Sequence, residues 1–171
     1  MAVKFTKPEI NVREKLAELD FAKVPYHKMP AGSVIQYASI STGTSVSTTS
    51  TSYVDSGIDI FFSPKLANSK VLVTVQSRRF NLVTSDVLNI KCLRDDSVNI
   101  GIQNQSVQDG HFQNNNSSAA NQIAYPLHYM WEDSPGGTAE VKYSMYFKVN
   151  AGTGYLADSG GVQLYVQEIA Q

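Results

Sequence analysis

The stretch TAEVKYSMYFKV, residues 138–149, alternates apolar and polar side chains more regularly than any other part of the chain. One side of this stretch would carry Val141, Tyr143, Met145, Phe147 and Val149. The other side would carry Glu140, Lys142, Ser144, Tyr146 and Lys148. A period of two places successive side chains on opposite faces of a strand. The stretch therefore predicts a β-strand with one face in a core and the other face toward solvent.

Further strand patterns lie on both sides of this stretch. They are SVIQYASIS (33–41), IDIFF (58–62), VLVTVQS (71–77), VLNIKCLR (87–94), VNIGI (98–102), NQIAYPLHYMWED (121–133) and VQLYVQEI (162–169). VLVTVQS begins apolar on both faces and is predicted to be central. Pro126 cannot donate a ladder hydrogen bond, which indicates an edge or bulged strand. Cys92 alternates with Leu88 and Ile90, which indicates a buried thiol with no role in catalysis.

Many short strands separated by turn residues, with no second helical pattern after residue 30, predict an all-β protein. We expect an antiparallel β-sandwich of jelly-roll or immunoglobulin-like type over residues 31–171. SPGG, residues 134–137, is predicted to be a hairpin turn between the two strands that flank it. DSGG, residues 158–161, is predicted to lie in a loop before a strand.

Residues 1–30 differ in pattern from the rest. Thr6 and Glu9 have the spacing of a capping box, which satisfies the first free amides of a helix. Val12, Leu16 and Leu19 then repeat at helical spacing and give one apolar stripe. The following segment contains prolines and is predicted to be an extended linker. We therefore expect an N-terminal amphipathic helix and a proline-containing linker (1–30) ahead of the β domain (31–171).

Composition argues against several classes of protein. The net charge is -1, whereas nucleic-acid binding usually requires a basic face. Arg78 and Arg79 are the only basic doublet, and we interpret them as solvated residues on a strand. We see no apolar run long enough for a membrane span and no apolar signal-peptide core, so we expect synthesis in a cytoplasm without membrane insertion. A single cysteine forms no intramolecular disulfide.

The residues offer no constellation for catalysis. His27, His111 and His128 each lack a second ligand at metal-binding spacing, although histidines of several copies could still meet at a symmetry axis. Glu132 and Asp133 are neighbours that would point apart, and we interpret them as a solvated turn rather than the opposed pair of a glycosidase. We expect no enzyme activity, no catalytic residue, no metal and no cofactor.

Three stretches resemble structural proteins of tailed bacteriophages, especially marine and cyanobacterial ones. VKFTKPEINVREKLAELD (3–20) resembles a short N-terminal segment found ahead of unrelated C-terminal parts in many phage fibre-type proteins. MPAGSVIQ (29–36), with the Ser- and Thr-rich residues after it, resembles the start of a recurrent phage β domain. MWEDSPGGTAEVKYSMYFKV (130–149) and LYVQEIAQ (164–171) resemble the closing strands of that domain.

The resemblance implies a non-enzymatic virion component made in the host cytoplasm. The helix would anchor the chain to phage tail or capsid proteins, through Phe5, Pro8, Ile10, Val12, Leu16 and Leu19. The β domain would project as part of a homotrimer, in which several weak contacts combine into one tight attachment. Our first interpretation is a short tail fibre or spike that adsorbs to the host surface. The alternatives are a capsid decoration protein, as a head fibre or cement, and a soluble carbohydrate-binding module.

Aromatic residues are the candidates for recognition, because tyrosines among amides contact sugars and proteins well. The candidate surface residues, which would meet a host-surface glycan, are Tyr37, Tyr53, His111, Phe112, Tyr146 and Tyr155. Tyr165 likewise occupies a position that alternates away from the apolar face of its strand. The competing explanation is that these tyrosines are buried between copies of the chain or against a second sheet.

Overall fold

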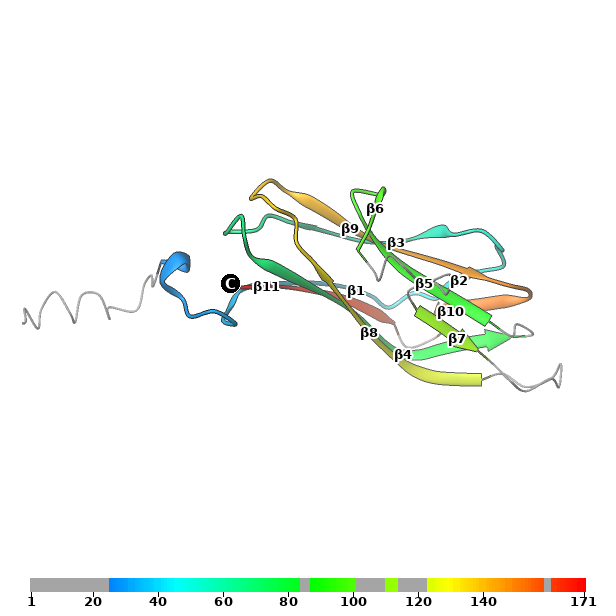
Figure 1. Cartoon of the computed structure of the whole chain (residues 1–171). Coiled ribbons are helices and arrows are strands. Elements are labelled where there is room, and N and C mark those ends of the chain that lie inside the picture. The colour runs from blue at the N-terminus through cyan, green and yellow to red at the C-terminus, as the bar shows by residue number, and fades with distance from the viewer. Residues whose placement is uncertain (1–24, 84–86, 101–109, 114–122, 159–160) are drawn as a thin grey trace, which may run out of the picture.

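The predicted strand patterns form two stacked antiparallel sheets in a computed structural model (Figure 1). The structure describes residues 25–83, 87–100, 110–113, 123–158 and 161–171. The strands are β1 (Val34–Thr42), β2 (Val46–Thr48), β3 (Val54–Phe62), β4 (Lys70–Val83), β5 (Val87–Arg94), β6 (Val98–Asn99), β7 (Gly110–Gln113), β8 (Ile123–Asp133), β9 (Val141–Val149), β10 (Thr153–Ala157) and β11 (Val162–Ile169). The prediction of an all-β sandwich is confirmed.

The predicted N-terminal helix, with its six anchoring residues, lies outside the described residues. The described part of the linker begins at Pro25 and is not wholly extended, because Tyr26–Lys28 form one 3-10 turn, η1. Pro25 supplies the carbonyl that accepts the first hydrogen bond of this turn, from the Lys28 amide at 2.8 Å.

The first layer, which we call sheet A, has the strand order β1-β11-β4-β10-β2, and β8 pairs with β4. The long strand β4 is central, as its sequence predicted: β8 follows one side of it, and β11 and β10 follow the other side in turn. The second layer, sheet B, has the order β3-β9-β5-β6, and β7 also pairs with β5. Every strand pairing is antiparallel.

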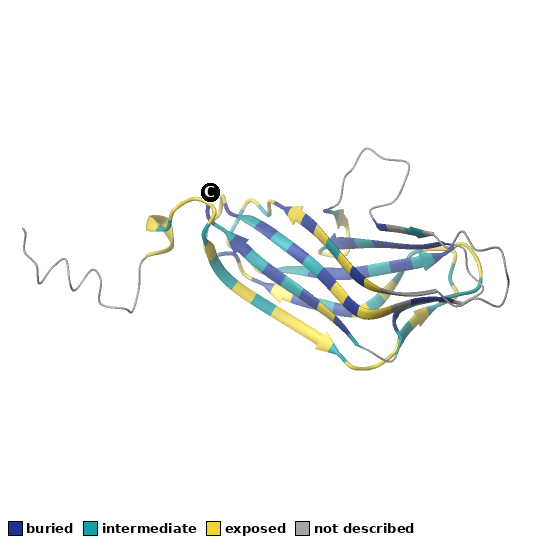
Figure 2. Ribbon diagram, turned by 90° about the horizontal axis from the view of Figure 1, so that it is seen from below, coloured by how far each residue is buried: buried dark blue, intermediate teal, exposed yellow. Residues whose placement is uncertain are grey.

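The core lies between the two sheets and consists mainly of the apolar rows read from the sequence, to which β10 adds Leu156 and Ala157 (Figure 2). In β9, Tyr143, Met145, Phe147 and Val149 are all buried. The Cys92 thiol is free and buried, as predicted. The edge strand β1 has no buried residue along its length.

Pro126 lies where the pairing of β8 with β4 breaks. Leu127 pairs with Ser77 and Tyr125 pairs with Phe80, so Pro126 alone stands opposite Arg78 and Arg79. Two residues facing one residue define a β-bulge, and a proline fits there because it has no amide to donate. The prediction of an edge or bulged strand is confirmed, since β8 is both.

One prediction about a connection was wrong, and one strand was not predicted. SPGG does not close a hairpin, because β8 belongs to sheet A and β9 belongs to sheet B. Strand β10, which the sequence patterns did not predict, pairs with both β2 and β4. Gly154 allows this strand to lie against the core: a Cβ there would approach Leu88 Cδ1 and Val149 Cγ1 to 2.5 Å each. A glycine inside a strand often marks such a close approach.

Two carboxylates face inward on one rung of sheet A, where Val71 pairs with Glu168 on one side and Asp133 on the other. Asp133 accepts two hydrogen bonds from Arg94 Nη1, at 2.8 and 2.7 Å, and one from the Tyr143 hydroxyl at 2.9 Å. Arg94 and Tyr143 belong to sheet B, so this cluster joins the two layers. The interpretation of Asp133 as part of a solvated turn was therefore wrong, whereas Glu132 is exposed and pairs with Lys70.

Glu168 is fully buried and is held mainly by backbone amides. Its carboxylate accepts hydrogen bonds from the Lys65 and Leu66 amides at 2.9 Å and from Gln36 Nε2 at 2.7 Å. A buried carboxylate requires such donors, because transfer of an unpaired charge from water is very costly. Glu168 therefore fastens the connection between β3 and β4 to the end of the sandwich where the chain enters.

Candidate functional site

The outer face of sheet A is the first candidate site. It is built by outward-facing residues of four neighbouring strands, which the pairing registers place in rows across the sheet. One row contains Ser41, Gln163, Gln76 and His128, and the next contains Ser39, Tyr165, Thr74 and Met130. Hydroxyl, amide and aromatic groups therefore gather on this face, and neither row contains an acid.

Tyr165 on β11 is the centre of this face. Its ring lies 6.0 Å from the ring of Tyr37, centroid to centroid, at an interplanar angle of 35°. Its hydroxyl donates a hydrogen bond to the side-chain oxygen Oε1 of Gln163, and Oε1 of Gln76 lies 3.4 Å away. The phenol has one proton to donate, so it orients the Gln163 amide and lies beside the Gln76 amide on the adjacent strand. Tilted aromatic pairs at this distance are favourable.

A hollow of about 390 Å³ opens on this face beside Tyr165. Its lining comes from the end of β1, the start of β11 and the middle of β4. The lining residues are Ser41, Thr42, Gly43, Gln76, Arg78, Gly161, Val162, Gln163 and Tyr165. The volume falls within the range of about 300–1,000 Å³ that is typical of small-molecule sites. Arg78 is the only charged residue among these nine.

The bulge in β4 decides how the arginine pair is presented. Arg78 and Arg79 are consecutive and both exposed, whereas a regular strand would turn one of them inward. Arg79 Nε lies 3.5 Å from Asp158 Oδ2, and Asn81 Nδ2 donates to the same oxygen at 2.8 Å. Among the described residues, no acid lies within ion-pair distance of Arg78. The bulge thus gives Arg79 an acidic partner and leaves Arg78 at the hollow.

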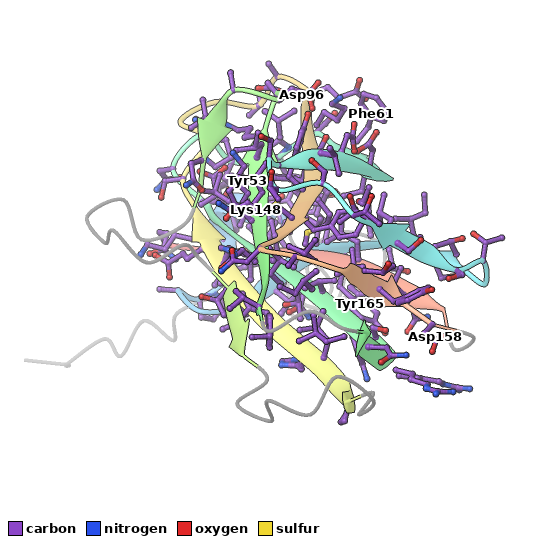
Figure 3. All side chains as sticks on the ribbon, turned by 90° about the vertical axis from the view of Figure 1, so that its right-hand side faces the viewer. Tyr53, Phe61, Asp96, Lys148, Asp158 and Tyr165 are labelled. Atoms are coloured by element: carbon purple, nitrogen blue, oxygen red, sulfur yellow. The ribbon has the colours of Figure 1, made fainter. Side chains whose placement is uncertain are left out.

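A second cluster lies on sheet B, apart from Tyr165 and Asp158 (Figure 3). Tyr53 is its centre: Lys91 Nζ lies 4.4 Å and Lys148 Nζ 5.1 Å from the centroid of its ring. Lys91 Nζ also lies 5.7 Å from the ring centroid of Tyr146. Ammonium groups over aromatic faces are attracted by the ring quadrupole. This arrangement holds two cations close together on the outer side of the sheet.

The turn after β5 lies over the same side of β9 and adds an acid. Asp96 accepts hydrogen bonds from Lys142 Nζ, from Ser144 Oγ at 3.0 Å and from the Tyr146 hydroxyl at 3.3 Å. The Lys142 ammonium holds the pKa of the Asp96 carboxyl below its ordinary value. Partial burial and the negative charge of Asp96 raise the pKa of the Tyr146 phenol. These contacts account for the burial of Ser144, which alternation alone would expose.

The structure separates the six candidate recognition residues. Tyr53 and Tyr146 share the sheet B cluster, whereas Tyr37 is exposed on β1 of sheet A. Tyr155 is half-buried on β10, and Phe112 is partly buried and packed against the core. His111 lies on β7, but its side chain is outside the described residues. Of the candidates whose side chains the structure describes, Tyr37 alone adjoins the hollow, through its contact with Tyr165.

Sequence reasoning missed the residues that form the hollow, notably Gln76, Arg78 and Gln163. Gln76 and Gln163 occupy outward positions on their strands, which the alternation does indicate. Their proximity depends on the pairing of β4 with β11, which joins segments far apart in the chain. The sequence pattern of each strand does not specify which other strand will pair with it.

The described residues contain no group of three His, Cys, Asp or Glu side chains that could hold a metal ion. Within the same residues, no helix is long and apolar enough to cross a membrane. Glu168 and Asp133 are engaged by the structural contacts described above. No model of a known protein family matches the chain, and no curated protein is significantly similar to it.

Proposed function

We propose that the chain is a non-enzymatic structural protein of a tailed-phage virion. It would be a short trimeric tail fibre or spike, attached through its N-terminal segment, with the β domain projecting for adsorption to the host surface. The proposal begins from the sequence resemblance described above, and the path of the chain through the sandwich supports it.

The main supporting observation is that the chain enters and leaves the β domain at one end. The Gly32 amide donates to the Ala170 carbonyl at 2.8 Å, and the Ala170 amide donates to the Ser33 carbonyl at 2.9 Å. Figure 1 places η1 and the C-terminus together, with β2 and β10 toward the opposite end. A domain held through its N-terminal side would therefore present the opposite end outward.

We also infer that the sandwich is a jelly roll. Leaving aside the short strands β2, β6 and β10, sheet A runs β1-β11-β4-β8 and sheet B runs β3-β9-β5-β7. The chain thus crosses between the layers at almost every connection, and only β5 and β7 are successive neighbours in one sheet. Two interleaved four-stranded sheets of this kind are the jelly-roll arrangement, which viral capsid domains and lectins use.

Exposed apolar side chains near one side of the sandwich support contact between copies of the chain. Val34 and Ile40 are exposed on the edge strand β1. Phe61, on the edge strand β3 of the other sheet, is 62% exposed. Unpaired edges with apolar residues are unusual on a soluble surface unless a partner covers them. A threefold assembly would cover these residues and multiply weak contacts with a host surface.

Removal of residues 2–24 tests the attachment. We expect the truncated chain to keep the circular dichroism and melting curve of the full-length chain but to be missing from purified particles. Full-length protein supplied in the same way to phage lacking the gene is the matched control. Normal incorporation of the truncated chain, or its failure to fold, would contradict the proposal.

A further inference from the structure

We propose that the hollow beside Tyr165 binds a saccharide that carries an anionic group, a carboxylate or a sulfate. This deepens the proposed function and rests on it for the biological role, because it names the class of surface glycan that the β domain would meet. The binding itself requires only the hollow, so it can be tested on purified protein.

The charge distribution at the hollow favours an anion. Among the nine described lining residues, Arg78 and the Tyr165 phenol are the only ionisable groups, and none of the nine is an acid. The neighbouring Arg79 differs, because Asp158 lies within ion-pair distance of it. A guanidinium presents several donors in a planar fork that matches a carboxylate or sulfate. No described acid pairs with Arg78. Its guanidinium can therefore donate to a ligand without first breaking an ion pair with a described residue.

The amides of the hollow favour a ligand rich in acceptor atoms. The Tyr165 hydroxyl engages the side-chain oxygen Oε1 of Gln163 and lies 3.4 Å from that of Gln76. Gln163, which accepts the proton of the phenol, then directs its amide N–H groups away from the ring hydroxyl. An amide nitrogen carries two donors, so the two side chains supply donors beside the guanidinium. Anionic oxygens and sugar oxygens both accept such hydrogen bonds.

The remaining lining explains why the ligand would be a saccharide rather than a free anion. The Tyr165 ring gives an apolar surface between polar groups, and amphipathic rings of this kind contact sugars while their hydroxyl remains bonded. Ser41 and Thr42 add hydroxyl groups at the rim. A hollow of about 390 Å³ is far larger than an inorganic anion requires. Ser41 also lies at the end of β1 remote from Val34, where the chain enters, so an anchored domain would leave the hollow accessible.

The test uses the full-length protein and ligand-observed saturation-transfer NMR titrations. Four probes separate the contributions: methyl β-D-glucuronide, methyl β-D-glucoside 6-sulfate, methyl β-D-glucoside and acetate, the last observed by its methyl signal. We expect the two charged glycosides to bind at least about fivefold more tightly than the neutral one, and their binding to weaken with added salt. Acetate should bind more weakly than the glucuronide, because it lacks the ring.

Two variants of the arginine pair provide a matched comparison. R78Q should reduce the affinity for the charged glycosides by about five- to tenfold and that for the neutral glycoside by less than about twofold. R79Q removes the same charge from the next residue and should change neither affinity. Tyr165→Leu should weaken all three glycosides, because the ring is lost. Melting curves of each variant establish that the fold is retained.

Equal binding of charged and neutral glycosides would overturn the proposal, as would equal losses in R78Q and R79Q. Acetate that binds as tightly as the glucuronide would indicate an anion site without a saccharide, and would also overturn it. Absence of saturation transfer from every glycoside would have the same consequence. None of these results concerns attachment to a particle, so a failure of the pocket and a failure of the virion role are distinguishable.

Discussion

Replacement of Glu168 with alanine should strongly destabilise the β domain. The carboxylate is fully buried and accepts hydrogen bonds from the Lys65 and Leu66 amides and from Gln36 Nε2, at 2.7–2.9 Å. Each buried donor left without its acceptor costs about 1–3 kcal/mol, and water admitted by the smaller side chain recovers part of this. We therefore expect E168A to lower the free energy of unfolding by about 3–5 kcal/mol.

Urea denaturation followed by the fluorescence of Trp131 and by circular dichroism would measure this loss. E168Q should have an intermediate effect, because its amide keeps one oxygen as an acceptor but turns N–H groups toward donors. E140A is the control, since Glu140 is exposed, and it should fall within about 0.5 kcal/mol of the natural chain. A loss below about 1 kcal/mol in E168A would refute the claim that this carboxylate fastens the connection between β3 and β4.

Three further perturbations test the sandwich. G154A should lower stability by about 1–3 kcal/mol in urea titrations, because its methyl group would press on Leu88; a variant as stable as the natural chain would contradict the packing of β10. Phe147→Asp places a charge in the core and should abolish the cooperative melting transition, whereas an unchanged melting curve would mean that the two faces of β9 are assigned in reverse. Burial and the Asp133 carboxylate raise the pKa of the Tyr143 phenol far above its ordinary value of 10.0. Ionisation of Tyr143 at high pH therefore favours the unfolded chain, so the free energy of unfolding should fall as the pH rises above 10.0. The fall should be less steep in Tyr143→Phe. If the urea midpoints of the natural chain and the variant fall equally with pH, Tyr143 is not the cause.

The strands of the core could be predicted because their patterns are local. Phe147 and its neighbours in β9 alternate with polar residues, and the buried row follows directly from this alternation. Pro126 likewise indicated an edge or a bulge, because the missing amide is a property of the residue itself. Such features require no knowledge of the partner strand.

The errors concern features that depend on a partner. Asp133 resembles a turn residue in sequence, and only Arg94 and Tyr143 from the other sheet make its burial possible. Glu168 continues the inward row of Val162, Leu164 and Val166, yet its donors come from a connection about a hundred residues earlier. Strand β10 was missed because its glycines suggest a loop until the close contact at Gly154 is known.

The candidate site illustrates the same limit. The sequence drew attention to exposed aromatic residues, of which Tyr37 does lie on the outer face of sheet A. The hollow itself depends on the pairing of β4 with β11 and on the bulge opposite Pro126. Arg78 and Arg79 are chemically identical in sequence, and only the fold gives one of them an acidic partner.

The most direct test of the virion role is to locate the β domain on intact particles. An antibody raised against residues 31–171 would be applied to particles of the phage from which the chain is proposed to come, and gold label would be imaged by electron microscopy. The account predicts label at the tail, at the distal end of a short fibre or spike. Label spread over the head would contradict the adsorption role and indicate a capsid decoration protein. Particles without label, at an antibody concentration that detects the purified chain, would contradict the virion assignment itself.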